Sequence, residues 1–320
     1  MKKEDAKVYY RQLQKEAIPC PVCENSTHYS IYDNDRYGMG ISTVICSHCG
    51  LVYLNPRPTE AEMSEFYKHS YRKYYEAIEV PTPEYIANGP FLARAEFVLS
   101  KLSPYLEQKN EGKLLDVGCA EGTLLQTVKT HFPQLSTYGI EPSLGFGQYA
   151  EKHSQAQVFV GTYQDFFAQS AVKAFDFIVT THVLEHILDP RSFMQALHQY
   201  LSDDGLIYVE VPNVINNKKG ISAHLGHVVS YDPDTLSSLV NACGFEVVDM
   251  YTEGLPALTP SMGVICRKRT DGSSLEISAL SEAAMKSKID YLQKRVEYTN
   301  GRARQSRYSL QTLKRFITKK

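Results

Sequence analysis

The stretch that decides the fold is LLDVGCAEGT, residues 114–123. Its apolar start is typical of a buried strand, and its glycines are typical of a tight turn into a helix. Tyr138-Gly139-Ile140-Glu141 then reads as a second short strand that ends in an acid. Glycines let a ligand lie against bare backbone, a helix N-terminus favours negative charge, and an acid here can bind a ribose diol. These residues predict a site for a nucleoside cofactor.

The spacing of the glycines distinguishes between classes of cofactor. A dinucleotide site uses G-x-G-x-x-G to hold a pyrophosphate, whereas here Asp116 precedes Gly118, Ala120 and Gly122. This order resembles the first motif of class I S-adenosylmethionine-dependent methyltransferases, roughly D-x-G-x-G-x-G, with Ala120 in place of the middle glycine. The alternative interpretation is a glycine-rich turn in an ordinary βαβ unit.

Alternating strand and helix patterns from Gly112 to Arg267 predict a doubly wound α/β sheet. Asp189 followed by Pro190 predicts the start of one intervening helix. We expect strands near residues 113–118, 136–141, 156–160, 175–180, 205–211, 245–251 and 262–267. Seven strands that close with a hairpin resemble the Rossmann-like class I methyltransferase sheet, whose seventh strand is antiparallel.

Three later segments carry the same resemblance: GTYQDF at residues 161–166, FDFIVTTHVLEHILDP at 175–190 and GLIYVEVPN at 205–213. The resemblance implies that the cofactor is S-adenosylmethionine and that Thr162 and Tyr163 lie near its adenine. The residues that it implies for cofactor binding are Asp116, Gly118, Cys119, Ala120, Gly122, Glu141, Pro142, Thr162, Tyr163 and His182.

Four of the seven cysteines form two C-x-x-C knuckles, which are Cys20 with Cys23 and Cys46 with Cys49, 22 residues apart. This spacing is typical of a four-thiolate zinc ribbon, and a closed set of four sulfurs indicates a structural metal. The alternatives are a reducible disulfide pair or a redox motif, and a redox pair would not need a second knuckle of equal spacing. We expect zinc to hold residues 17–57 together.

The chain divides into four predicted parts. Residues 1–58 hold an N-terminal segment and the zinc module, 59–110 a helical linker or lid, 111–268 the cofactor domain, and 281–320 a helical tail. Thr59 with Glu62 predicts a capping box at the start of the linker helix. Its tyrosines either line a polar substrate pocket or pack between modules. This front end resembles that of bacterial methyltransferases found in sugar and polysaccharide pathways.

Composition argues against several classes of protein. The chain has 320 residues, 43% of them hydrophobic, and a net charge of −2. This charge gives no global attraction to nucleic acid or membranes, and no apolar run approaches the ~20 residues of a membrane span. The N-terminus leads into a polar stretch without an apolar signal region, so we expect a cytoplasmic protein with no nucleic-acid partner.

Methyl transfer to a hydroxyl usually needs a base, and histidine suits that role near neutral pH. Our first choice is His227, because HVVSY at residues 227–231 resembles the H-x-x-S-Y segment of zinc-containing sugar C-methyltransferases, where the histidine is the proposed base. His182 follows the fourth strand and is the second choice, before His186 or His224. Each of these histidines can instead satisfy backbone groups.

We therefore expect an enzyme that methylates a small polar acceptor, with a hydroxyl of a sugar or nucleotide sugar as the first choice. Lys218 and Lys219 lie in the long connection 212–231 and can bind a nucleotide phosphate or lie in solvent. The alternatives are C- or N-methylation of a sugar, an RNA methyltransferase, and a non-catalytic assembly protein.

The C-terminal tail has apolar or small residues at alternating steps of four and three from Met285 to Ile317. This is a heptad rhythm. It fits a helix that forms a homo-oligomer, a helix packed on its own domain, or a basic tail that binds a membrane surface or a partner.

Overall fold

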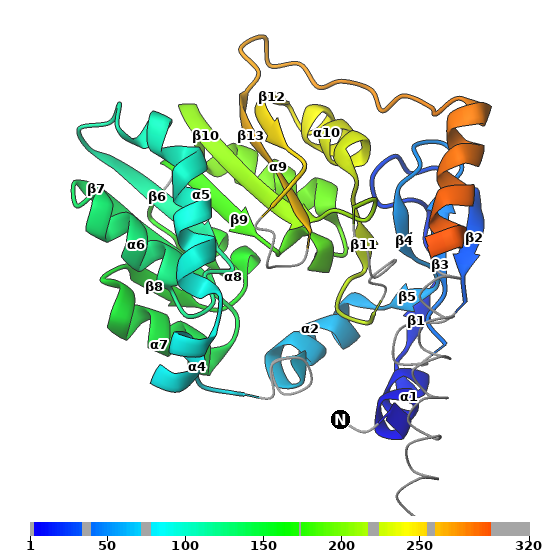
Figure 1. Ribbon diagram of the computed structural model, residues 1–320, viewed down its shortest axis with the longest axis horizontal. Helices are drawn as coiled ribbons and strands as arrows, with labels where there is room; N and C mark the ends of the chain where they lie inside the picture. Colours follow the sequence, from blue (N-terminus) through cyan, green and yellow to red (C-terminus); the bar gives the residue numbers. More distant parts are fainter. Residues whose placement is uncertain are drawn as a thin grey trace, which may run out of the picture.

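The computed structural model describes residues 3–33, 40–71, 78–172, 174–216, 224–254 and 260–295. Its largest element is a seven-stranded mixed sheet (Figure 1). In spatial order the strands are β12 (Phe245–Tyr251), β13 (Ser261–Lys268), β10 (Leu201–Pro212), β9 (Phe175–Thr181), β6 (Gly112–Val117), β7 (Leu135–Glu141) and β8 (Gln157–Val160). β6 to β10 are parallel, and β13 runs antiparallel to both neighbours. The predicted seven-stranded α/β sheet is confirmed.

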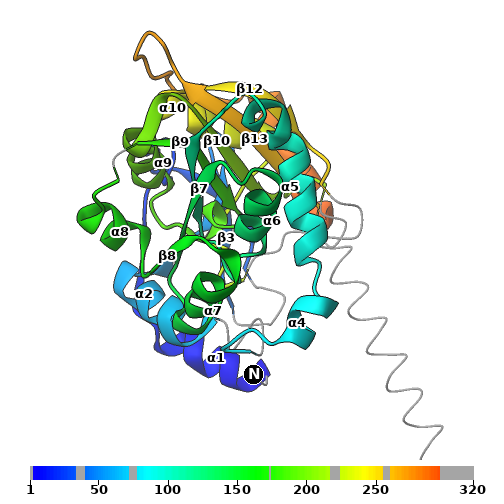
Figure 2. The ribbon, with the colours of Figure 1, turned by 90° about the vertical axis from the view of Figure 1, so that its left-hand side faces the viewer.

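Helices cover both faces of this sheet (Figure 2). One face carries α5 (Phe91–Leu106), α6 (Thr123–His131) and α7 (Leu144–Ser154), and the other carries α8 (Tyr163–Gln169), α9 (Pro190–Tyr200) and α10 (Pro233–Ala242). Successive side chains of a strand point to opposite faces, so Leu114 packs under α5 and α6 while Leu115 joins the core on the other side. Strands buried on both faces read as continuous apolar runs, which is why the sequence predicts them well.

The N-terminal zinc module is a separate four-stranded sheet. Its order is β11 (Val229–Ser230), β4 (Val52–Leu54), β3 (Thr43–Cys46) and β2 (His28–Tyr32). β11 comes from the connection that follows β10, so the methyltransferase-like part of the chain supplies one strand of the ribbon. Two elements precede this module in the chain, α1 (Lys3–Gln12) and β1 (Lys15–Glu16). β1 pairs with β5 (Arg57–Pro58), which follows β4.

The linker between the modules contains α2 (Glu60–His69) and α4 (Pro83–Asn88). The predicted capping box of α2 is wrong, because the side chain of Thr59 makes no cap hydrogen bond. The Glu62 carboxylate instead accepts a hydrogen bond of 3.2 Å from the backbone amide of Gln14. The acid is thus used to attach α2 to the segment after α1.

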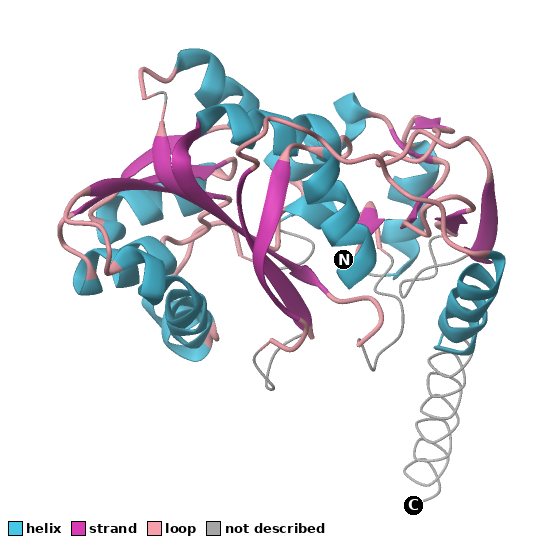
Figure 3. Ribbon diagram, turned by 90° about the horizontal axis from the view of Figure 1, so that it is seen from above, coloured by secondary structure: helices cyan, strands magenta, loops and turns pink. Residues whose placement is uncertain are grey.

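The tail continues after β13 as a loop and then as a helix over residues 282–295, which lies beside the ribbon sheet (Figures 1 and 3). Met285 and Leu292, two positions of the heptad rhythm, are 6% and 0% exposed and pack with Ile31 and Ile45. The described part of the tail therefore packs on its own chain, while residues 296–320 lie outside the described residues. No helix in the described ranges is both long and apolar enough to cross a bilayer.

Candidate active site and zinc centre

A cavity of about 1380 Å³ opens at the carboxyl ends of the parallel strands. This is where open α/β sheets bind their ligands. Its wall is formed by the turn after β6, the end of β7, the start of α8, the turn after β9, and parts of α2, α4 and α5. Single small-molecule sites measure roughly 300–1,000 Å³, so this cavity has room for a cofactor and an acceptor together.

The glycine turn after β6 has the backbone that its sequence predicts. Gly118 and Gly122 have φ of 81° and 82°, and Ala120 has φ of 48°. A Cβ atom on Gly118 would lie 2.4 Å from Cγ2 of Val183, so only glycine fits there. Gly122 does not line the cavity. A Cβ there would lie 2.9 Å from that of Ala150, so Gly122 instead allows α6 to approach α7.

Glu141 is buried at the end of β7 and faces this turn. Its Oε2 accepts a hydrogen bond of 3.1 Å from the amide of Ala120, and its Oε1 accepts one of 3.0 Å from the amide of Ser143. Each carboxylate oxygen can accept further hydrogen bonds. The acid is therefore rigidly held in the cavity wall while it keeps capacity for the hydroxyls of a ribose.

Asp116 lies deeper in the same wall, close to Glu121 and Glu141. Burial, together with these two acids, raises the pKa of Asp116 to about 8. Its Oδ1 atom is buried and meets no hydrogen-bond donor among the described residues. A buried acceptor without a donor is unfavourable, so this wall suits a ligand that brings positive charge and N–H donors. S-adenosylmethionine has both, in its sulfonium and its ammonium group.

Thr162 and Tyr163 line the cavity at the start of α8. The hydroxyl of Thr162 donates to Oδ2 of Asp165 at 2.7 Å and accepts from the amide of Asp165 at 3.2 Å. This hydroxyl is used to cap the helix, and the ring of Tyr163 packs against that of Phe193. Burial raises the pKa of Tyr163 to about 12, so its hydroxyl stays protonated as a donor.

His182 follows β9 in a left-handed conformation, with φ of 55°. Its Nδ1 lies 3.2 Å from Oε1 of Glu185, and its Nε2 lies 3.2 Å from Oε1 of Glu210. Burial alone would lower the pKa of His182, but the two carboxylates outweigh burial and raise it. Each ring nitrogen thus lies at ion-pair distance from a carboxylate oxygen, an arrangement that favours a charged imidazolium over a free base.

Glu210, which no sequence motif had indicated, contacts both His182 and two tyrosines. Its Oε2 accepts hydrogen bonds from the hydroxyls of Tyr208 at 2.7 Å and Tyr251 at 2.5 Å. Burial would raise the pKa of Glu210, but the contacts with His182 and the two tyrosines lower it to about 2. An acid in the apolar run of β10 was the signal that could have identified it.

His186 and His227 come together on the other side of Glu185, with ring centroids 4.9 Å apart. His186 belongs to the 3-10 helix η1 (Leu184–His186), and its Nδ1 is hydrogen-bonded to the carbonyl of Gly226. Because a carbonyl only accepts, Nδ1 carries a proton, and Nε2 on the other side of the ring lies 3.9 Å from Oε1 of Glu185. The ring of His224 packs 4.0 Å from that of His227. His186 and His227 both line the cavity.

This histidine pair can act as a proton acceptor or hold a cation. Glu185, His186 and His227 each present a ligand atom within 4.8 Å of the others. The hydroxyl of Tyr67 in α2 lies 3.1 Å from Nδ1 of His186 and donates to the carbonyl of Gly226 at 2.9 Å. Tyr67, one tyrosine of the predicted tyrosine-rich helix, therefore helps to orient this pair. The sequence did not indicate this role.

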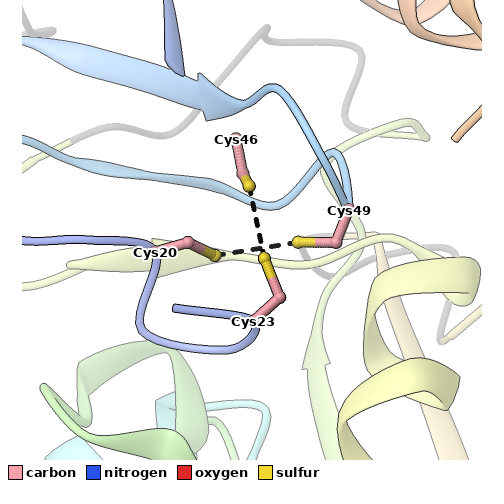
Figure 4. A group of neighbouring side chains, drawn as sticks. All are labelled: Cys20, Cys23, Cys46 and Cys49. Carbon is pink, nitrogen blue, oxygen red and sulfur yellow. Dashed lines mark hydrogen bonds between the residues drawn. The ribbon is translucent and has the colours of Figure 1, made fainter. Parts of the chain in front are cut away.

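The four cysteines of the two knuckles converge in the ribbon (Figure 4). The sulfurs of Cys20 and Cys49 lie 3.7 Å apart, and those of Cys23 and Cys46 lie 3.4 Å apart. A tetrahedron of zinc–sulfur bonds of about 2.3 Å places its sulfurs about 3.8 Å apart, so the set fits zinc. His48 is not a ligand in this arrangement, because its Nε2 contacts the carbonyl of Ile277 at 3.0 Å.

The cavity brings together most of the predicted site residues. Those that line it are Asp116, Gly118, Cys119, Ala120, Glu141, Pro142, Thr162, Tyr163, His182, His186 and His227. His224 is buried behind His227 and does not line the cavity, and Lys218 and Lys219 lie outside the described residues. Arg94 of α5 was missed. It lines the cavity, and its buried Nε meets no acceptor among the described residues.

Comparison with known proteins agrees with this geometry. Residues 92–250 match the family described as "Methyltransferase domain", and residues 15–52 match "Zinc-binding domain of primase-helicase". A ubiquinone biosynthesis O-methyltransferase of Glaesserella parasuis is 29% identical over 121 residues, 34% of this chain and 50% of that protein. Its counterpart in Actinobacillus pleuropneumoniae serotype 7 is 31% identical over 121 residues, 34% of this chain and 51% of its own.

The chain thus spans about half the length of the curated relatives that it matches. Among solved structures, the plantazolicin methyltransferase BpumL in complex with SAH superposes with a TM-score of 0.50 at 16% identity. That match covers 65% of this chain and 94% of BpumL. At this identity the likeness supports the fold. Residues 92–250 therefore form an S-adenosylmethionine-dependent methyltransferase domain, which this chain joins to an N-terminal zinc ribbon.

Proposed function

We propose that this protein methylates a hydroxyl of a small polar acceptor, with a sugar or nucleotide sugar as the acceptor class. The observation that carries the proposal is that one cavity holds both the glycine turn with Glu141 and the pair His186 and His227. The O-methyltransferase names of the curated relatives support oxygen as the acceptor atom. Hydroxyl and aromatic groups of Tyr67 and Tyr71 in the wall suit a sugar ring.

S-adenosylmethionine, when bound, would supply an electrophilic methyl group: an O–C bond to the acceptor would form as the C–S bond breaks and S-adenosylhomocysteine leaves. In our proposal Glu141 binds the ribose diol, and Asp116, which gives up its proton as the cofactor binds, meets the positively charged end of the molecule. The Nε atom of Arg94 is buried and meets no acceptor among the described residues, and we assign this side chain to the carboxylate of the methionine part. These residues would hold the cofactor in a fixed position beside the acceptor half of the cavity.

We assign the role of base to His227, which takes the proton from the acceptor hydroxyl. His186 beside it is oriented by the carbonyl of Gly226 at Nδ1 and by the carboxylate of Glu185 at Nε2. His182 is assigned a different role because both of its nitrogens face carboxylates. We assign His182 to holding Glu185 and Glu210 in a charged triad in the wall of the cavity.

The test is formation of S-adenosylhomocysteine by the purified full chain against nucleotide sugars, free sugars and phenols, with an RNA arm. Turnover of a sugar by the wild type, and a fall of about 10²- to 10⁴-fold in kcat in His227→Ala, is the expected result. The matched control is His131→Ala, because His131 is an exposed histidine of α6. Turnover that persists in His227→Ala would remove the base assignment.

A second acceptor class is favoured by the relatives. Their names place them in ubiquinone biosynthesis, and the acceptor half of the cavity, beside His186, has the aromatic rings of Tyr67 and Tyr71. These rings suit a phenolic ring as well as a sugar. Turnover of the phenols but not of the sugars would transfer the proposal to that class.

A further inference from the structure

The zinc ribbon and the histidine-bearing loop share a β-sheet. β11 pairs antiparallel with β4 of the ribbon, with Val229 opposite Tyr53 and Ser230 opposite Val52. The amide of Leu54 also donates to the carbonyl of Val228 at 3.0 Å. Since Val228 directly follows His227, the ribbon fixes the backbone next to the proposed base. Figure 1 shows β11 beside β4 at the junction of the two sheets.

The same residue continues the contact into the active site. The amide of Val228 donates to the carbonyl of Glu185 at 2.9 Å. Val228 is 1% exposed, and buried backbone groups are almost always paired. A path of hydrogen bonds therefore runs from Leu54 in the ribbon through Val228 to η1, which carries Glu185 and His186.

Two arginines attach the ribbon region to the segment just after His186. Arg57, which follows β4 in the chain, donates from its guanidinium to the carbonyl of Leu188. Arg191 at the start of α9 donates to the carbonyl of Val22, between the first two cysteines, at 3.1 Å. The ribbon region thus contacts both segments that contribute a histidine to the pair.

The metal ligands lie close to this junction. Cys46 is the last residue of β3, and its amide donates to the carbonyl of Leu51 at 2.8 Å, next to the first residue of β4. Structural zinc supplies much of the folding free energy of such small modules. The edge that β11 pairs with is therefore expected to form only when the metal is bound.

The glycine turn after β6 is held in place by hydrogen bonds to β7. The amides of Gly118 and Cys119 donate to the carbonyl of Ile140 at 2.8 and 3.0 Å, within the seven-stranded sheet. Ala120 is fixed by Glu141 in the same sheet. These contacts do not pass through the ribbon.

We propose that the zinc ribbon is a positioning element of the active site, in which zinc ligation by the four cysteines holds His227 and His186 in place. Loss of zinc would then disorganise the acceptor half of the cavity and leave the cofactor half intact. The expected effect of zinc loss on turnover rests on the proposed function. The expected effect on the protection of backbone amides from hydrogen exchange does not.

The test compares the full-length zinc-bound wild type with Cys49→Ser, with Cys243→Ser as the control, because Cys243 is a buried cysteine outside the knuckles. Zinc content, S-adenosylhomocysteine affinity by calorimetry and amide hydrogen exchange are measured on each. In Cys49→Ser we expect loss of zinc, at least tenfold faster exchange at residues 224–231, and an unchanged rate at residues 114–123. Affinity for S-adenosylhomocysteine should stay within twofold, while kcat falls at least tenfold.

A second variant separates positioning from general unfolding. Ser230→Pro leaves all four cysteines in place and removes the N–H of Ser230, which forms a hydrogen-bonded pair with Val52 between β11 and β4. We expect it to retain zinc and cofactor affinity, with faster exchange at residues 224–231 and a reduced kcat. Reversible removal and return of zinc in the wild type gives the same readout without a substitution.

Two results would overturn the proposal. One is full protection of the amides of residues 224–231 from hydrogen exchange in zinc-free protein, and the other is an unchanged exchange rate of these residues in zinc-bound Ser230→Pro. If the wild type turns over no acceptor of the panel, the proposed function fails. Hydrogen exchange would still decide whether the ribbon holds this loop.

Discussion

The amide of Ala120 donates a hydrogen bond of 3.1 Å to Oε2 of Glu141, which joins the cofactor turn to the end of the next strand. In Glu141→Gln the shape is kept and the charge is lost. A hydrogen bond to a charged group contributes about 1.5–3 kcal/mol, so we expect affinity for S-adenosylhomocysteine to fall about 10- to 100-fold by calorimetry. Glu151→Gln, on the exposed side of α7, is the control. Equal affinity in both variants would contradict the ribose assignment.

Cofactor binding is expected to release a proton from Asp116. Burial and two neighbouring acids raise its pKa to about 8, so the free protein carries this proton below pH 8. A bound sulfonium and ammonium favour the carboxylate and lower that pKa. Calorimetry at pH 7.5 in phosphate and in Tris should therefore give different apparent enthalpies for S-adenosylmethionine. The difference should shrink in Asp116→Asn, and equal enthalpies in the wild type would oppose this assignment.

The triad of Glu185, His182 and Glu210 should make stability depend on pH. The pKa of His182 is raised above 6.5, so its contribution is complete below pH 6.5 and is lost as the pH rises through the raised value. The pKa values of both glutamates are lowered, Glu210 to about 2, so their contribution is complete above about pH 4.5 and is lost on further acidification.

In the window between pH 4.5 and 6.5, His182→Gln should therefore cost about 3–5 kcal/mol, the usual penalty for breaking a buried pair. Thermal unfolding of wild type and variant at pH 5.5 and pH 9 measures this. We expect the difference in melting temperature between wild type and His182→Gln to be smaller at pH 9 than at pH 5.5. A gap that is independent of pH would show that the imidazole is not charged.

Leu292→Ala tests where the C-terminal helix packs. Leu292 is fully buried against the ribbon, and such truncations cost about 2–5 kcal/mol. Leu275→Ala, at a residue that is 47% exposed, should cost much less. Because the contact is within one chain, the loss of stability measured by thermal unfolding should be the same at every protein concentration. A loss that grows on dilution would instead indicate an oligomer.

The sequence predicted the seven-stranded sheet because its buried strands are apolar runs bounded by turns. It was less accurate at β10, which begins at Leu201 rather than near residue 205. Ser202, Asp203 and Asp204 gave no strand signal, and the register with β9 shifts between Leu201 and Leu206. The predicted division of the chain at residues 58, 110 and 268 stays a prediction.

The candidate site was predictable only where one segment carries the whole motif. The glycine turn and the two cysteine knuckles are local patterns, so the sequence shows them directly. The partners of His182 are partly non-local, because Glu210 belongs to a different strand. Likewise, β11 has two residues and no periodicity, and its partner Tyr53 lies far away in the sequence. Tertiary pairing alone explains these features.

The strand that the ribbon borrows also sets an order of assembly. The cysteine knuckles and β4 leave the ribosome first, whereas β11 follows well over a hundred residues later. Until then the outer edge of β4 lacks its partner strand, and unpaired edges invite pairing with other chains. A nascent ribbon is therefore exposed to misassembly for as long as the large sheet takes to be synthesised. Slow translation between the two halves should lower the yield of native protein more than slow translation after β11.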